Sequence, residues 1–296
     1  MSAGQRKKTK FIGLISVIVC FSLLLSGCVS LKAIQNFAEK SMQTSAYEAF
    51  VDDYRDSLVR TQQYERELKG TDAAKLEEWE QQNSEKLNVR ENHKKGLKTI
   101  HITVVQYMAC LATLASDNLF TYDTAMKGLA GELVANPAFS AQSKEVKAVG
   151  NISGILFQAF GEKYRQDKLK TIIRDANAPF QDLIGSLKEF MGLYVTVLAN
   201  EKNVLEADYG VLIKYRNEKE PTGVVLANSI LIEKNAVLAS RVKSANQYIE
   251  LLNEIGKGHQ HLYDHMDKLS DKEVLSAMLN YAQKITQIYS AIQALK

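Results

Sequence analysis

The sequence is poor in cysteine, in proline and in net charge, and each shortage excludes a class of protein. It has three cysteines in 296 residues, too few for a disulfide-rich scaffold. Three prolines are too few for a loop-rich or collagen-like chain. A formal net charge of +3 is too small for a nucleic-acid-binding surface. Because 46% of the residues are hydrophobic, the chain is also too apolar to be disordered, and we expect an ordered protein without a nucleic-acid partner.

Catalytic signatures and strand patterns are also missing from the sequence. No nucleophile elbow, phosphate-binding loop or dinucleotide-binding fingerprint occurs in the context that each requires. No alternation typical of strands and no hairpin turn signal competes with the helical periodicity. Cys110 lies in an apolar run and is expected to be a small buried side chain. We therefore predict an all-α protein that is not an enzyme and has no cofactor.

The N-terminus has the features of an export signal. Arg6, Lys7, Lys8 and Lys10 precede an apolar run from Phe11 to Leu25. This order is typical of a cleaved signal, and the run is shorter than the ~20 residues that a transmembrane helix needs. Four of the 37 basic residues, and no acidic ones, lie in residues 1–27, which leaves 33 basic and 34 acidic residues. The slight basic bias therefore belongs to the signal.

The end of this segment, Leu25-Ser26-Gly27-Cys28, resembles the lipobox of bacterial lipoproteins. The resemblance implies that a signal peptidase recognises Leu25, Ser26 and Gly27 and that Cys28 carries covalent lipid, with acyl chains such as palmitate. Two or three acyl chains anchor a protein stably in a membrane. Val29, in place of aspartate, favours the outer membrane if the host is Gram-negative. An ordinary secretory signal with a chance cysteine is the alternative.

These features divide the chain into three parts. Residues 1–27 are the cleaved signal peptide, 28–30 are the lipidated N-terminus with a short tether, and 31–296 form a single helical-bundle domain. The expected location is the cell envelope, on the periplasmic side or at the surface.

Glycine and proline mark the expected ends of the helices. A first helix is predicted from about 31 to 69, ended by Gly70. Thr71 and Asp72 can cap a polar helix that contains Trp79, and a third helical stretch covers 85–116. Prolines occur every 42 residues, and each is expected to open a helix of similar length, because proline favours the first helical turn; they are Pro137, Pro179 and Pro221.

Apolar residues recur every seven residues in the second half of the chain. One ladder consists of Ile184, Met191, Leu198, Leu205 and Leu212, and the next of Val224, Leu231, Leu238, Ala245 and Leu252. Near the C-terminus, apolar residues alternate in steps of three and four from Leu275 to Ile292, after a capping box at 270–273. Such spacing favours coiled-coil-like packing. The predicted fold is an elongated all-α bundle of about five to seven long antiparallel helices.

The favoured function is a lipid-anchored envelope protein that contacts a protein partner; a homo-oligomer is left open. One alternative is a membrane-active protein with the architecture of α-helical pore formers, which would insert the uncharged segments 99–116 and 148–161. Gly150 and Gly154 in the second segment would equally allow close packing of helices inside a core. Burial of both segments in a soluble core is the interpretation we prefer.

A second alternative is a periplasmic metal binder. Three of the five histidines lie close together, and His261 and His265 are one helical turn apart, so they could bind zinc or copper with His259 nearby. The cluster lacks the glutamate of a His-Glu-x-x-His site. A solvated joint between helices is the simpler interpretation.

Overall fold

The structure is a computed structural model that describes residues 31–43, 46–68, 73–116, 129–159, 166–216 and 221–295. This part of the chain is helical and contains no strand. Its elements in order are α2 (Lys32–Ser41), α3 (Ala46–Leu68), α4 (Ala73–Ala115), α5 (Leu129–Ala135), α6 (Lys144–Ala159), α7 (Gln166–Arg216), α8 (Pro221–Asp264), the 3₁₀ helix η3 (Met266–Lys268) and α9 (Lys272–Gln293). The predicted all-α class is confirmed.

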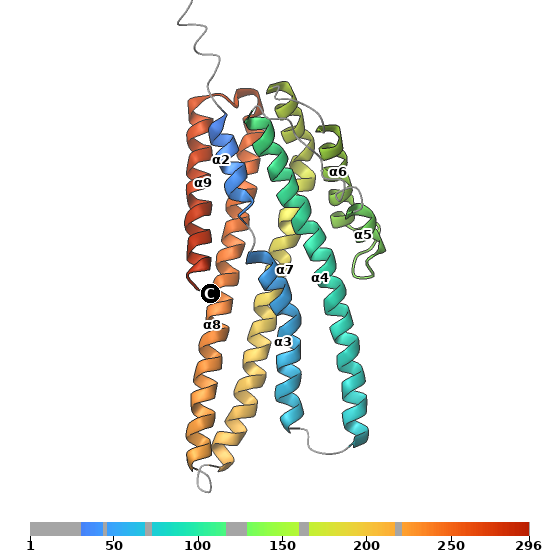
Figure 1. The fold of residues 1–296 in the computed structure, drawn as a ribbon, viewed down its shortest axis with the longest axis vertical. Helices are drawn as coiled ribbons and strands as arrows, with labels where there is room; N and C mark the ends of the chain where they lie inside the picture. The colour runs from blue at the N-terminus through green and yellow to red at the C-terminus, as the bar shows by residue number, and fades with distance from the viewer. Residues whose placement is uncertain are drawn as a thin grey trace, which may run out of the picture.

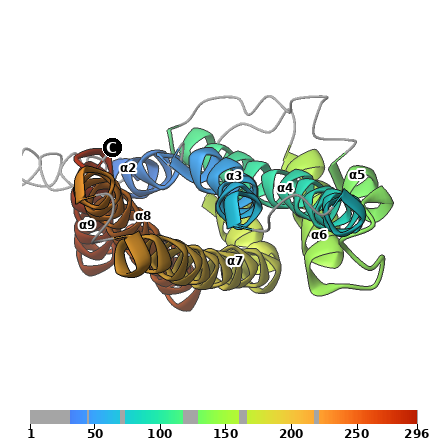
Figure 2. The ribbon, with the colours of Figure 1, turned by 90° about the horizontal axis from the view of Figure 1, so that it is seen from below.

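The long helices run up and down an elongated bundle (Figure 1). Seen from below, α3 and α4 lie on one side, and α7 and α8 on the other (Figure 2). The helix α9 packs against α8 and α2, whereas α6 packs against α7 and α4. Successive long helices run in opposite directions, as predicted for antiparallel packing (Figure 1).

The predicted first helix is in fact two helices. The helix α2 ends at Ser41, and α3 begins at Ala46. The two pieces pack differently, because α2 packs against α9 and α4, whereas α3 packs against α7 and α4. A single straight helix could not serve both sets of neighbours, so the prediction of one helix over 31–69 is wrong.

The next prediction failed in the opposite sense. The separate helices expected around Trp79 and over 85–116 are one 43-residue helix, α4. The residues expected to cap the first of them, Thr71 and Asp72, lie outside the described residues. Without a proline or a turn signal between 79 and 85, nothing interrupts the backbone hydrogen bonds, so the change from polar to apolar sequence occurs within α4.

The prolines do not all open helices. Pro221 begins α8 as predicted, but Pro137 lies in the turn after α5, and Pro179 lies inside α7. Proline inside a helix removes one backbone hydrogen bond. The residues around it, Ala176 and Phe180, are fully buried. Packing of this part of α7 therefore outweighs the local cost of the proline.

The last helix also begins differently from the prediction. Asp271, rather than Ser270, is the N-cap of α9, and its side chain makes no capping hydrogen bond. The predicted capping box at 270–273 is therefore wrong, although the helix that it was meant to start begins within two residues of the expected place.

The seven-residue ladders form the core of the bundle. Ile184, Met191, Leu198 and Leu205 of α7 are buried. In α8 the ladder is buried at Leu238, Ala245 and Leu252. In α9 the buried positions include Met278, Ala282, Ile285 and Ile292. The heptad spacing therefore predicted correctly which faces of these helices pack inward.

One close approach between helices depends on a glycine. A β-carbon at Gly258 of α8 would lie 2.3 Å from Cε2 of Phe37, which is fully buried in α2. We expect Gly258→Ala to lower the free energy of unfolding by about 1–3 kcal/mol, because the Phe37 ring must move in a packed core. Urea denaturation measures this difference.

The matched control is Gly192→Ala in α7, where a β-carbon would meet no atom within 4 Å. Alanine there should raise stability by about 0.5–1 kcal/mol, since glycine inside a helix is unfavourable. If both variants gained stability, the close packing of Phe37 against Gly258 would be wrong.

Candidate binding groove

The residues of the predicted lipidation signal, Leu25, Ser26, Gly27 and Cys28, lie outside the described residues. The first described helix, α2, begins at Lys32, only four residues after Cys28 in sequence. It lies at the upper end of the bundle in Figure 1, beside α9. A lipid on Cys28 would therefore attach the bundle near this end.

The structure separates His259 from the other two histidines of the predicted metal cluster. The ring of His259 is fully buried, with Nε2 2.6 Å from the Tyr107 hydroxyl and Nδ1 3.0 Å from the Asn177 side-chain oxygen. Burial lowers the pKa of His259 to about 3. A neutral ring with both nitrogens hydrogen-bonded fits a core residue better than a metal ligand.

His261 and His265 do lie together, as predicted. Their rings stack with centroids 4.2 Å apart, and Nδ1 of His265 is 2.9 Å from the backbone oxygen of His261. Burial and the neighbouring His265 both lower the pKa of His261. Within the described part of the chain, no three histidine, cysteine or acidic side chains gather as a metal site would require. Of the three histidines predicted to bind a metal, only His261 and His265 therefore lie together.

The segment 99–116 forms the buried upper part of α4. Tyr107, Met108, Cys110 and Leu111 in it are fully buried. Burial raises the pKa of the Cys110 thiol to about 12, so this thiol is a poor nucleophile at neutral pH. A β-carbon added at Gly150 or Gly154 of α6 would meet no atom within 4 Å. These glycines therefore do not mediate the close helix packing that their spacing suggested.

Among the described residues, α4 and α8 are each long and apolar enough to cross a membrane, but their surroundings differ. In the most apolar 18-residue window, 67% of the residues are buried in α4 and only 11% in α8. The apolar stretch of α4 is thus core, whereas much of that of α8 is surface. The residues responsible are Val225, Leu226, Ile232 and Val237, all exposed.

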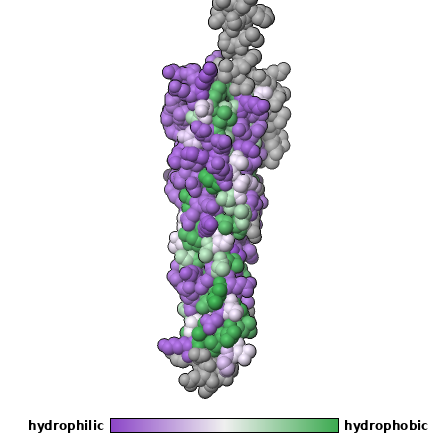
Figure 3. All heavy atoms as spheres, turned by 90° about the vertical axis from the view of Figure 1, so that its left-hand side faces the viewer, coloured by the Kyte–Doolittle hydropathy of each residue, from purple (hydrophilic) through white to green (hydrophobic). Residues whose placement is uncertain are grey.

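The length of α9 explains why Leu226 and Val237 are exposed, whereas Val225 and Ile232 lie in a column of α8 that is exposed at Ala239 and Asn246 as well. The helix α8 has 44 residues and α9 has 22, so α9, about 33 Å long, covers only the upper half of α8, which is about 66 Å long. In Figure 1 the chain ends beside the middle of α8. On the side where α8 and α9 lie, hydrophobic surface gathers mostly in the lower half (Figure 3). We call this surface of α8, from Val225 to Val237, the open face.

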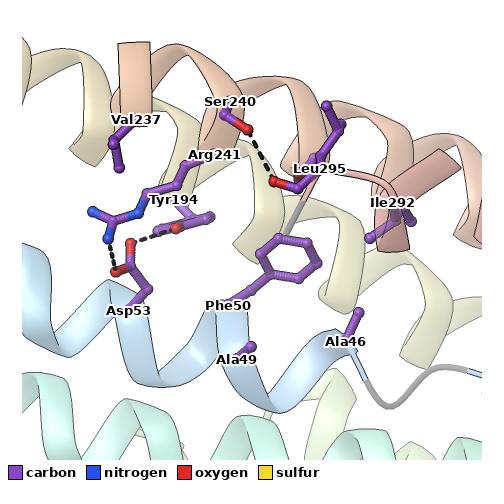
Figure 4. A pocket seen from close by; sticks show the side chains of 11 residues that line it. Ala46, Ala49, Phe50, Asp53, Tyr194, Val237, Ser240, Arg241, Ile292 and Leu295 are labelled. Atoms are coloured by element: carbon purple, nitrogen blue, oxygen red, sulfur yellow. Dashed lines mark hydrogen bonds and ion pairs between the residues drawn. The ribbon is translucent and has the colours of Figure 1, made fainter. Parts of the chain in front are cut away.

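A pocket of about 500 Å³ lies where α9 ends (Figure 4). Its apolar part is formed by three residues of α3 and two near the C-terminus: Ala46, Ala49, Phe50, Ile292 and Leu295. The facing wall belongs to α8 and consists of Val237, Ser240 and Ser244. The Ser240 hydroxyl donates a hydrogen bond to the backbone oxygen of Leu295 at 3.2 Å. A volume of this size is typical of binding pockets.

The polar end of the pocket is a network of charges. Arg60 of α3 donates to Asp53 at 2.9 Å and to Glu201 of α7 at 2.6 Å. Burial lowers the pKa of Arg60, but its hydrogen bonds to Glu201 and Asp53 outweigh that effect and raise the pKa overall. The Tyr194 hydroxyl donates to Asp53 at 2.5 Å, and both burial and Asp53 raise the pKa of Tyr194. The network fixes α3 against α7 and gives the pocket a rigid polar end.

A smaller cavity of about 200 Å³ extends the pocket downward between α3 and α8. Val237 and Arg241 line both cavities, so the two form one groove. Arg241 makes a single ion pair, 3.5 Å from Asp53, and the carboxylate of Glu233 makes no hydrogen bond or ion pair with any described residue. Outside the Arg60 network, the groove therefore combines apolar walls with the acidic Glu233 and two basic groups, Arg241 and Lys234, of which Lys234 donates to the Tyr64 hydroxyl at 3.1 Å.

This groove was not predicted from the sequence, although one signal was present. The ladder from Val224 to Leu252 defines the inward face of α8, and Val225, Leu226, Ile232 and Val237 lie off that ladder. Apolar residues on two faces of one helix predict that both faces have partners.

Comparison with known proteins adds no family to this description: no protein-family model, no curated protein and no solved structure matches the chain.

Proposed function

We propose that this protein is a lipid-anchored, non-enzymatic protein of the bacterial envelope that presents a binding surface to a protein partner. The observation that carries the proposal is the open face of α8, which is apolar and which no described helix covers. Exposed apolar patches of this kind mark interaction sites in soluble domains. The resemblance of residues 25–28 to a lipobox supplies the anchor, and the following Val29 supports the outer membrane as its location.

The position of the open face favours a protein over the anchoring membrane as its occupant. Ile232 precedes the upper end of α8, at Asp264, by 32 residues, or about 48 Å of helix. The helix α2, which follows Cys28, lies at that upper end (Figure 1). A bundle standing on its anchor would thus hold the open face well beyond the bilayer surface.

The anchor is tested by Cys28→Ala. Without the acylated thiol, the protein should move from the membrane fraction to the soluble fraction, because the mature chain is nearly neutral and has no basic excess to hold it on lipid. Fractionation of cells expressing each protein measures this, with mass spectrometry of the N-terminal peptide as a check on acylation. A variant that stays membrane-bound through high-salt washing contradicts the lipid anchor.

The binding surface is tested by Val225→Asp combined with Ile232→Asp. Two charges on the open face should abolish recovery of a partner that co-purifies with the wild-type protein from its own membranes, because burying unpaired carboxylates is costly. Leu279→Asp is the matched control, since Leu279 is an exposed leucine on α9 away from this face. Equal recovery by all three proteins contradicts the proposed role.

A membrane-active function remains the alternative, now with a different segment. The open face of α8 is more accessible than 99–116 or than the buried side of 148–159, the described part of the second segment. Leakage of liposomes caused by the delipidated wild-type protein, and lost in the double aspartate variant, would favour this alternative over a protein partner.

A further inference from the structure

At Val237, the open face continues a surface that is covered in the upper half of α8. Residues seven apart lie nearly above one another on a helix. Along one such column, Leu251 is fully buried and Ser244 is 8% exposed, but Val237 is 44% exposed. The change occurs at the end of α9, because Ser240 bonds Leu295 just beyond the last turn of that helix. Among the described residues, one face of α8 therefore has a helix on its upper half and none on its lower half.

The groove below α9 has walls on both sides. The α3 side runs from Ala46 to Tyr64, the α8 side from Glu233 to Ser244, and the buried carboxylate of Glu201 in α7 lies at its base. The hydrogen bonds of Arg60 to α3 and α7 residues hold this base in place. The groove is thus preformed, which reduces the ordering cost of binding.

We propose that this groove binds an amphipathic helix of a different protein, which continues the path of α9 along the lower half of α8. The inference rests on the proposed function and names the partner's chemistry. The helix would place a large apolar side chain in the pocket beside Phe50 and Ile292 and cover Val237 on the open face. Recognition of helices in apolar grooves uses side chains at such three- and four-residue intervals.

Two of the charged residues that line the groove, Arg241 and Glu233, define the polar part of the partner, and Lys234 beside them is hydrogen-bonded to Tyr64. Arg241 and Glu233 are eight residues apart on α8, which is about 12 Å of helix. Neither charge is fully satisfied by the described residues, since Arg241 has one ion pair at 3.5 Å and Glu233 has no hydrogen bond or ion pair with them. A matching helix carries an acidic residue opposite Arg241 and a basic residue seven or eight positions away, opposite Glu233.

The same charges argue against a second copy of this chain as the occupant. Copies anchored in one membrane would stand in the same direction, and a twofold axis that is parallel to the bundle and passes through this groove would bring the two Glu233 side chains together. Like charges brought together at an interface oppose association. A separate protein with a basic residue at that point avoids this repulsion.

The test uses two synthetic peptides, each about 21 residues long so that its helix spans the ~30 Å below α9, with leucine at the a and d positions of each heptad. One carries glutamate and lysine eight residues apart on the flank, and the other carries glutamate at both positions. Their dissociation constants are measured by fluorescence anisotropy against the full-length wild-type protein and against Glu233→Lys, a substitution that removes no hydrogen bond or ion pair among the described residues.

The wild-type protein should prefer the glutamate–lysine peptide by about fivefold, and Glu233→Lys should prefer the two-glutamate peptide by a similar factor. Val237→Asp, folded by circular dichroism, should bind neither peptide. The proposal is overturned if neither peptide binds the wild type, or if both proteins show the same preference. If co-purification of a partner was still abolished by Val225→Asp with Ile232→Asp, the proposed function would stand, and the partner's binding site would lie outside the groove.

Discussion

Replacing Arg60 with methionine is expected to lower the free energy of unfolding by about 3 kcal/mol. Among the described residues, Arg60 is the only hydrogen-bonding partner of the Glu201 carboxylate, whose side chain is 2% exposed, and it also makes two hydrogen bonds to Asp53. Without the guanidinium group, a buried carboxylate would lose its countercharge in the centre of the bundle. Removing one member of a buried ion pair destabilises a protein by more than the intact pair stabilises it, because the remaining charge is still desolvated.

Urea denaturation monitored by circular dichroism measures this loss. Arg174→Met is the matched control, because Arg174 pairs with Asp175 on the exposed surface, and its removal should leave the free energy of unfolding nearly unchanged. The double variant Arg60→Met with Glu201→Met should recover part of the lost stability, since no charge is then left unpaired at Glu201. A loss below about 1 kcal/mol for Arg60→Met would show that the network does not hold α3 against α7.

The second large effect is the dependence of stability on pH through His259. Its pKa is about 3 in the folded protein because the ring is buried, whereas the unfolded chain has a histidine pKa of about 6.5. Above about pH 6.5 the ring is neutral in both states and contributes no pH dependence. Below that pH the unfolded state takes up a proton that the folded state does not, so stability falls by about 1.4 kcal/mol per pH unit.

Between about pH 6.5 and pH 4.5, His259 alone should lower the free energy of unfolding by about 2–3 kcal/mol. Urea midpoints of the wild type and His259→Gln across this range measure it, because glutamine stays neutral and can still reach Tyr107 and Asn177. The carboxyl groups of Asp52 and Glu254 have lowered pKa values, so their protonation at acid pH lowers the free energy of unfolding in both proteins. Parallel pH profiles for the two proteins would contradict a neutral, buried His259.

The sequence predicted the parts of the fold that depend on local periodicity. The heptad ladders identified the inward faces of α7, α8 and α9, because a residue's face on a helix follows directly from its number. The same rule separates His259 from His261, which lie about 200° apart around α8. Helical spacing alone is therefore enough to exclude His259 from a metal site formed by His261 and His265.

Features that depend on tertiary packing could not be predicted in this way. Pro179 remains inside α7 because it packs in the core together with Ala176 and Phe180, and this burial cannot be deduced from the proline itself. Arg60 and Glu201 are 141 residues apart in the chain, and no spacing rule connects them. The groove arises because α9 stops halfway along α8, and this depends on how the two helices lie side by side.

The lower half of α8 is thus proposed to bind a protein partner while the bundle is anchored by lipid. The most direct measurement places a photoreactive amino acid at Ile232, and at Leu279 as the control, in the full-length acylated protein in its own membranes. After illumination, mass spectrometry of the adducts should show a protein peptide at Ile232, with apolar residues at helical spacing, and no such adduct at Leu279. A phospholipid adduct at Ile232, or the same products at both positions, would contradict the claim.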